Sequence, residues 1–218
     1  MSELIDQGCI LHTRPLRESS LILTCLTATH GLMSFTARGG KRSPRSTQAK
    51  FQPFQTLSLT WRDRHKTGLV TLRTIDITHP MWLTGLKLKC GLYLNQLLIQ
   101  LLNPEEPCQS LFDAYTETIK HIDQGIKPVD VLLRHFEHQL FAELGFSIPF
   151  EQIENPYHHY TYDLHQGFLP ASTSNGFQGE ALIKLAQGQL ESSETRQVAK
   201  YFSRQIITQL KQEKFSQP

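Results

Sequence analysis

A glycine-rich basic segment at residues 37–43, Ala-Arg-Gly-Gly-Lys-Arg-Ser, is the first candidate for chemistry. Such a segment can contact phosphates, because glycine lets the backbone approach a ligand closely and Lys or Arg neutralises its charge. It is not a nucleotide-binding P-loop: Phe35 stands where the first glycine of GxxxxGK[ST] belongs, and Arg42 replaces the residue that binds Mg²⁺. We therefore interpret it as a flexible basic loop between two strands.

Basic residues concentrate in the N-terminal part of a chain whose formal net charge is only +2. Residues 1–80 contain eleven Lys or Arg and five Asp or Glu, whereas residues 81–218 contain eleven and fifteen. Within 38–73, nine basic residues accompany a single acid, Asp63. This asymmetry indicates a polyanion as the partner of the basic part. The alternative is a basic face that only keeps the protein soluble.

Aromatic residues lie among these cations, at Phe35, Phe51, Phe54 and Trp61. Single-stranded nucleic-acid sites combine cations along the phosphates with rings on which the bases stack. For Trp61 the sequence leaves both base stacking and a place in the core open, while for Phe35 and Phe54 it favours the core. The predicted DNA-binding residues are Arg14, Arg38, Lys41, Arg42, Arg45, Lys50, Trp61, Arg62 and Arg64.

The histidines and cysteines do not form a recognisable metal site. His158-His159 with His165, and His135 with His138, are the histidine clusters, and no cysteine or paired acid completes a tetrahedral set. The four cysteines lie far apart without a CxxC pair. The motifs GxSxG, HExxH and GxGxxG are absent. We therefore expect no metal, no cofactor and no enzymatic activity.

The elements that must position the basic residues change in character near Pro80. Before it, short segments rich in β-branched and aromatic residues predict strands at 9–13, 21–26, 32–37, 56–61 and 69–74. Five strands without an intervening helix predict a small closed barrel over residues 1–80. The OB-fold is favoured, since it is the common five-stranded barrel and binds oligonucleotides. An SH3-like barrel is the alternative.

After Pro80 the apolar residues recur with helical spacing, which predicts a second domain, α-helical, over 81–218 and an α+β fold for the chain. Helices are predicted at 85–102, near 111–125, and at 129–144, 179–188 and 194–212. The segment 150–177 has no clear period and is predicted to be irregular. No run approaches the ~18 apolar residues of a membrane span, and the start lacks the features of a signal peptide. We expect a soluble, cytoplasmic protein.

An ordered set of segments carries a resemblance: residues 12–23, 30–32, 37–42 and 52–54 in the first half, and 91–98, 133–137 and 144–146 in the second. These segments resemble, in the expected order, those of the RecO family of bacterial recombination mediators. Each motif alone is weak, but the ordered set runs through almost the whole chain.

The resemblance implies an N-terminal OB-fold, a helical domain and a non-catalytic, nucleoid-associated function. Members of the family bind single- and double-stranded DNA and anneal complementary strands. With RecR, and sometimes RecF, they help RecA load onto DNA covered by single-strand-binding protein. Many members carry a four-cysteine zinc module that corresponds to about residues 150–177. This segment has no cysteine, so we predict a module without metal.

The resemblance also implies that the acidic tail of single-strand-binding protein, closed by a hydrophobic residue, docks on the helical domain. Such a peptide needs an apolar pocket and a cation for its carboxylate, which Arg can bind in bidentate form. Arg134 is the predicted cation; the alternative is a surface arginine paired with Asp130 or Glu137. Two other functions stay open: an RNA-binding or ribosome-associated OB-fold protein, and an interaction scaffold whose basic face is unused.

Overall fold

A computed structural model of the chain describes residues 3–17, 20–38, 49–62, 68–172 and 176–216. In this part of the chain a five-stranded closed barrel is followed by five α-helices and a small sheet, which confirms the predicted α+β class. The contacts divide the chain into two compact units, Met1–Ile126 and Lys127–Pro218.

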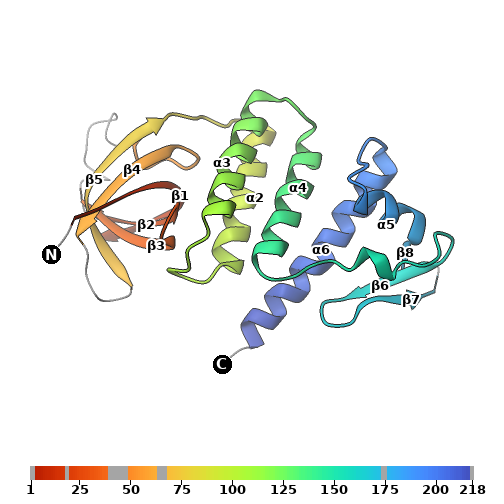
Figure 1. Cartoon of the computed structure of the whole chain (residues 1–218). Coiled ribbons are helices and arrows are strands. Elements are labelled where there is room, and N and C mark those ends of the chain that lie inside the picture. The colour runs from red at the N-terminus through yellow and green to blue at the C-terminus, as the bar shows by residue number, and fades with distance from the viewer. Residues whose placement is uncertain (1–2, 18–19, 39–48, 63–67, 173–175, 217–218) are drawn as a thin grey trace. The chain divides into compact units, whose positions relative to one another are not determined.

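The barrel occupies the first part of unit 1 (Figure 1). Its strands are β1 (Glu3–Arg17), β2 (Ser20–Thr27), β3 (Gly31–Arg38), β4 (Thr56–Arg62) and β5 (Leu69–His79). They close in the order β1-β2-β3-β5-β4, which is the strand order of an OB-fold, and β3 and β5 are the parallel pair.

Strand β1 is much longer than predicted because it pairs with two neighbours. Residues 3–9 pair with β4 and residues 8–17 pair with β2, so one long strand closes the barrel. A register shift between Ile10 and His12 marks a bulge where the strand changes partner, and such bulges increase the local bend of a strand. The inward residues of all five strands form one apolar core.

Helices α2 (Gly85–Leu101) and α3 (Gln109–Gln124) pack on β1 and β2 respectively. The buried Asn95 amide donates a hydrogen bond to the Leu11 carbonyl oxygen (3.0 Å) and accepts one from the Tyr115 hydroxyl (2.7 Å). This chain of bonds joins both helices to the barrel. The compact unit therefore extends to Ile126, whereas the change from strands to helices lies near residue 80, where the sequence places the domain boundary.

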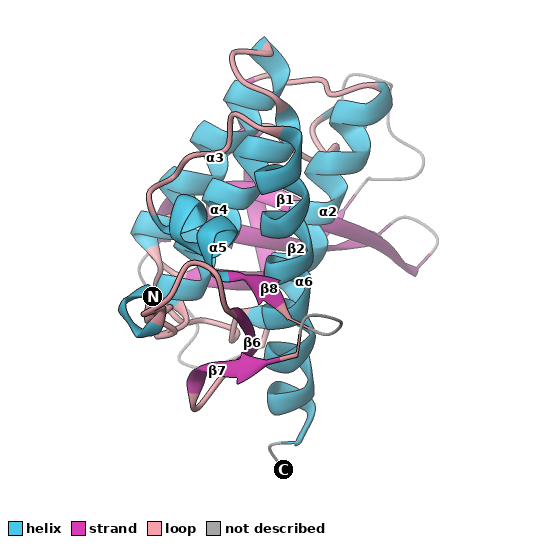
Figure 2. Ribbon diagram, turned by 90° about the vertical axis from the view of Figure 1, so that its right-hand side faces the viewer, coloured by secondary structure: helices cyan, strands magenta, loops and turns pink. Residues whose placement is uncertain are grey.

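Unit 2 contains α4 (Val129–Glu143), the short 3₁₀ helix η1 (Phe150–Gln152), α5 (Gly179–Ala186) and α6 (Ser193–Ser216). All five predicted helices of the chain are thus confirmed, each within a few residues of its expected ends. The prediction that 150–177 is irregular is wrong. The segment contributes β6 (His159–Asp163), β7 (Gly167–Ala171) and the start of β8 (Phe177–Gln178), which form an antiparallel sheet in the order β7-β6-β8 beside α6 (Figure 2).

Aromatic rings hold this sheet on α6. The rings of Phe168 and Phe202 stack at 5.6 Å, and Tyr162 meets both edge-on, at 5.1 and 5.3 Å. The side-chain amides of Gln205 and Gln209 each donate a 2.9 Å hydrogen bond to the Tyr162 carbonyl oxygen. A small sheet that cannot bury its own face thus obtains a core from a helix that lies about 40 residues later in the sequence.

Candidate nucleic-acid interface and peptide pocket

Three of the predicted DNA-binding arginines lie exposed on the barrel. Arg14 on β1 is opposite Ile22, and Arg38 on β3 is opposite Ser20, so these two flank the beginning of β2. Arg62 lies at the end of β4, opposite Glu3. None of the three forms an ion pair with another described residue. Their guanidinium groups are therefore available to an anion.

Two other cations of the barrel are engaged by acids of their own unit. The Lys50 ammonium donates to Asp76 Oδ1 (2.8 Å) and to the Ile75 carbonyl oxygen (2.9 Å). Arg73, which was not among the predicted residues, pairs with Glu3 at 2.7 Å. A phosphate would have to compete with these carboxylates, so Lys50 is a weaker candidate than the three arginines.

Four predicted cations, Lys41, Arg42, Arg45 and Arg64, lie outside the described residues. Their assignment to DNA stays a prediction that rests on the sequence.

The structure corrects the assignment of Trp61 to base stacking. Its side chain is only 2 % exposed, and its ring packs in the barrel core 5.2 Å from Phe35 and 5.1 Å from His30. The Asp6 carboxylate holds the His30 ring in place, with its Oδ2 atom 2.8 Å from His30 Nδ1. A buried ring has no face for a base. Phe35 and Phe54 are buried, as the sequence favours.

An exposed ring lies elsewhere in the same unit. Trp82, three residues beyond the end of β5, is 58 % exposed, and the sequence reasoning missed it. The signal was its position: it lies two residues after Pro80, outside the alternating pattern of the strands.

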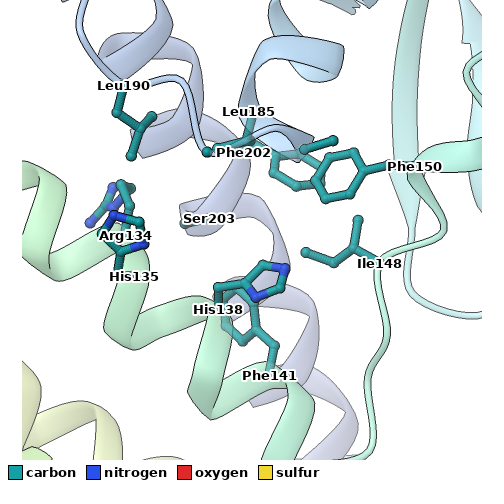
Figure 3. A pocket seen from close by; sticks show the side chains of 12 residues that line it. Arg134, His135, His138, Phe141, Ile148, Phe150, Leu185, Leu190, Phe202 and Ser203 are labelled. Atoms are coloured by element: carbon teal, nitrogen blue, oxygen red, sulfur yellow. The ribbon is translucent and has the colours of Figure 1, made fainter. Parts of the chain in front are cut away.

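Unit 2 contains an open pocket of about 230 Å³ lined by α4, Ile148 and the start of η1, α5, the segment between α5 and α6, and α6. Figure 3 shows Arg134, His135 and His138 on α4 facing Phe150, Leu190 and Phe202 across this space. The full lining is Arg134, His135, His138, Phe141, Ile148, Phe150, Leu185, Ala186, Gly188, Leu190, Phe202 and Ser203. The pocket combines apolar walls with cationic or titratable groups on one side. It therefore has the chemistry that an acidic peptide with an apolar end requires.

Arg134 lines this pocket, but its charge is paired. Its guanidinium donates to Glu137 Oε1 at 2.5 Å, and the two side chains are 9 % and 0 % exposed. Its Nε atom has no hydrogen-bond partner among the described residues. Asp130, the other expected partner, pairs instead with Arg196 at 3.0 Å. Arg134 thus forms part of the pocket wall, and its contact with a peptide carboxylate stays a prediction.

His135 is the pocket residue whose titration is shifted. Burial, reinforced by the nearby Lys127 and His138, lowers the pKa of the His135 ring below its ordinary value. The ring is therefore neutral at pH 7 and gains its charge only in more acidic solution. The sequence did not identify this pocket, because its lining comes from segments more than 60 residues apart that no local motif connects.

The described ranges gather no three His, Cys, Asp or Glu side chains at a spacing that could hold a metal ion. Of the helices in the same ranges, none has the length and apolarity needed to cross a bilayer.

Comparison with known proteins supplies the family. Residues 1–81 match the family model "Recombination protein O N terminal", and residues 83–153 match "Recombination protein O C terminal". A DNA repair protein RecO of Cellvibrio japonicus is 34% identical over 217 residues, covering 94% of this chain and 91% of its own. The RecO proteins of Methylococcus capsulatus and Coxiella burnetii are 31% and 32% identical, again over 94% of this chain and over 86% and 92% of theirs. The chain belongs to the RecO family of DNA repair proteins.

Proposed function

We propose that this protein is a non-catalytic recombination mediator whose barrel binds single- and double-stranded DNA and anneals complementary strands. The observation that carries the proposal is a RecO-family OB-fold with three exposed arginines on its strands, none of which forms an ion pair with another described residue. Two polyanionic strands repel one another, and a cationic surface that holds their phosphates lowers this repulsion without reading the bases. The mechanism is therefore electrostatic.

The pocket of unit 2 supports the second half of the proposal. We assign it to the acidic tail of single-strand-binding protein, with the terminal apolar side chain in the cavity and the carboxylates near α4. In this scheme the protein works with RecR, and in some settings RecF, at the nucleoid in the cytoplasm, where it helps RecA load on coated DNA.

Replacing Arg14, Arg38 and Arg62 together by Gln should weaken the binding of a labelled single-stranded DNA at least tenfold at 0.1 M salt. Each phosphate contact on a single strand contributes about 0.7 to the slope of log K against log[salt], so three lost contacts lower the slope by roughly 2. Fluorescence anisotropy over a salt series measures both quantities.

The matched control removes two exposed lysines of the same unit, Lys89→Gln with Lys120→Gln, and should leave the slope unchanged. A triple variant that keeps the wild-type slope would remove the three arginines from the interface. Equal or tighter binding of the same sequence as RNA would favour the RNA-binding alternative.

A second prediction concerns the pocket. Ala186 is exposed and lines the cavity, so Ala186→Trp should fill the space without unfolding the unit. We expect at least tenfold weaker binding of an acidic peptide that ends in Phe, with DNA affinity unchanged. Ala186→Ser, which adds a single oxygen atom, is the control. If Ala186→Trp bound the peptide as tightly as wild type, the peptide would bind outside this pocket.

The same peptide should bind more tightly as the pH falls from 7.5 to 5.5. Over this range the His135 ring, with its lowered pKa, begins to take up a proton, while the peptide carboxylates stay charged. Isothermal titration measures the affinity at each pH.

A further inference from the structure

Positive charge in unit 2 is concentrated on its last helix. Helix α6 contains five basic residues and two acidic ones, whereas the rest of the unit contains three basic and eight acidic residues. The helix is therefore a cationic element in an otherwise acidic unit. A charge count over residues 81–218 does not show the cationic helix, because the net charge of this part of the chain is negative.

Three of these cations share one face of α6. At 3.6 residues per turn, Lys200, Arg204 and Lys211 lie within about 40° of one another around the helix axis. They span roughly 16 Å along it, at 1.5 Å per residue. The opposite face packs on the sheet and the neighbouring helices through Phe202, Gln205 and Ile206 and their neighbours. The three cations thus form a straight stripe on the outside of the unit, which we call the α6 stripe.

No described acid neutralises the α6 stripe. Lys200 and Arg204 are exposed and Lys211 is half-buried, and none of them forms an ion pair with another described residue. Arg196, one turn before Lys200, is paired with Asp130, and the acid Glu213 lies 3.7 Å from His165 instead. Among the described residues, Arg196 and Glu213 of the helix thus have partners of opposite charge, and the three cations of the stripe do not.

This arrangement is unfavourable for the helix alone. Arg196, Lys200 and Arg204 follow one another at four-residue spacing, and like charges at this spacing repel and destabilise a helix. A polyanion bound along the stripe would offset this repulsion, because its charges attract the cations of the helix.

Exposed aromatic rings lie beside the cations. Tyr201, 52 % exposed, borders the stripe near its start, and Phe215, 81 % exposed, lies on the same face in the last turn. The last turns of α6 extend beyond the small sheet (Figure 2). Cations in a row with rings at both ends match a nucleic-acid strand, whose phosphates repeat and whose bases stack on aromatic faces.

We propose that the α6 stripe binds a single-stranded DNA segment and is a strand-binding surface separate from the barrel. The inference rests on the proposed DNA-binding function and extends it: annealing needs two strands held at once, and this chain then offers a cationic surface on each compact unit. An acidic protein tail fits the stripe less well, because its apolar end requires a pocket and the cavity of this unit is lined by Phe202 and Ser203 on another face of the helix.

The test compares wild type with Lys200→Gln/Arg204→Gln/Lys211→Gln in the full chain. We expect the salt slope for single-stranded DNA to fall by up to 2 and the rate of annealing of complementary oligonucleotides to fall at least fivefold. The charge-conserving variant Lys200→Arg/Arg204→Lys/Lys211→Arg should behave like wild type. A circular dichroism melt should show an unchanged or slightly higher midpoint, since the variant removes like-charge pairs.

Each other result overturns the proposal in a distinguishable way. An unchanged slope and annealing rate, with DNA binding still lost in the Arg14/Arg38/Arg62 variant, would remove α6 and keep the barrel function. Weaker binding of the acidic Phe-terminated peptide, with DNA binding intact, would identify the stripe as a protein-docking surface. Absence of DNA binding by the wild-type protein would remove both the stripe and the proposed function.

Discussion

Trp61→Ala should strongly destabilise the barrel rather than only weaken DNA binding. The indole is 2 % exposed and contacts Phe35 in the core that all five strands share, so its removal leaves a large cavity. Truncation of a buried aromatic side chain costs about 3–5 kcal/mol, a large part of the stability of a domain of this size. Urea unfolding followed by circular dichroism measures the loss as a lower midpoint.

Trp82→Ala is the matched control, because it removes the same side chain from a site that is 58 % exposed. Its effect on the free energy of unfolding should stay within about 0.5 kcal/mol. If Trp61→Ala kept the wild-type midpoint but lost affinity for single-stranded DNA, the ring would serve base stacking and not the core.

The alternating pattern of β4 already predicts that Trp61 is buried, although the sequence analysis kept it as a candidate for base stacking. Leu57, Leu59 and Trp61 alternate with Ser58 and Thr60, and residues two apart in a strand face the same side. The ring therefore had to share the face of two leucines. Trp61 is close to Arg62 and Arg64 in sequence, but this does not place their side chains on one side of the sheet. Adjacent residues of a strand point to opposite sides.

Periodicity predicted the helices and most strands, and it failed where pairing depends on distant residues. The first residues of β1, Glu3 to Gly8, are largely polar and are held in a strand by pairing with β4. Strands β6 and β8 have five and two residues, and they need the rings of α6 to bury one face. A local sequence pattern covers only a few neighbouring residues, so it includes neither β4, the partner of β1, nor α6, the partner of the small sheet.

The candidate sites divide in the same way. The exposed arginines were predictable, since charged residues at strand ends face solvent. The pairing of Lys50 with Asp76, 26 residues later, and the pocket around Arg134 were not, because they follow from tertiary contacts. The α6 stripe is visible as a helical pattern once the helix is known to bury its other face.

Arg134→Ala should destabilise unit 2 by about 3 kcal/mol, because it leaves the fully buried Glu137 carboxylate without its arginine. Replacing both residues, Arg134→Met with Glu137→Leu, should cost much less, since no buried charge remains. Lys184→Ala breaks the exposed pair with Glu180 and should leave the thermal midpoint of the protein nearly unchanged. Thermal and urea unfolding of the four proteins, wild type included, measure the differences.

The double variant also decides whether Arg134 contacts the peptide. In Arg134→Ala, lost binding of the acidic Phe-terminated peptide would follow from damage to the pocket wall and would assign no role to the guanidinium. In Arg134→Met/Glu137→Leu the wall is apolar and packed, so a loss of peptide affinity with wild-type stability would show that the arginine binds the carboxylate. Unchanged affinity would show that the peptide carboxylate does not depend on Arg134, and His135, which the pH series tests, would be the next candidate in the pocket. If Arg134→Ala were as stable as wild type, the buried pair would not hold α4 in place.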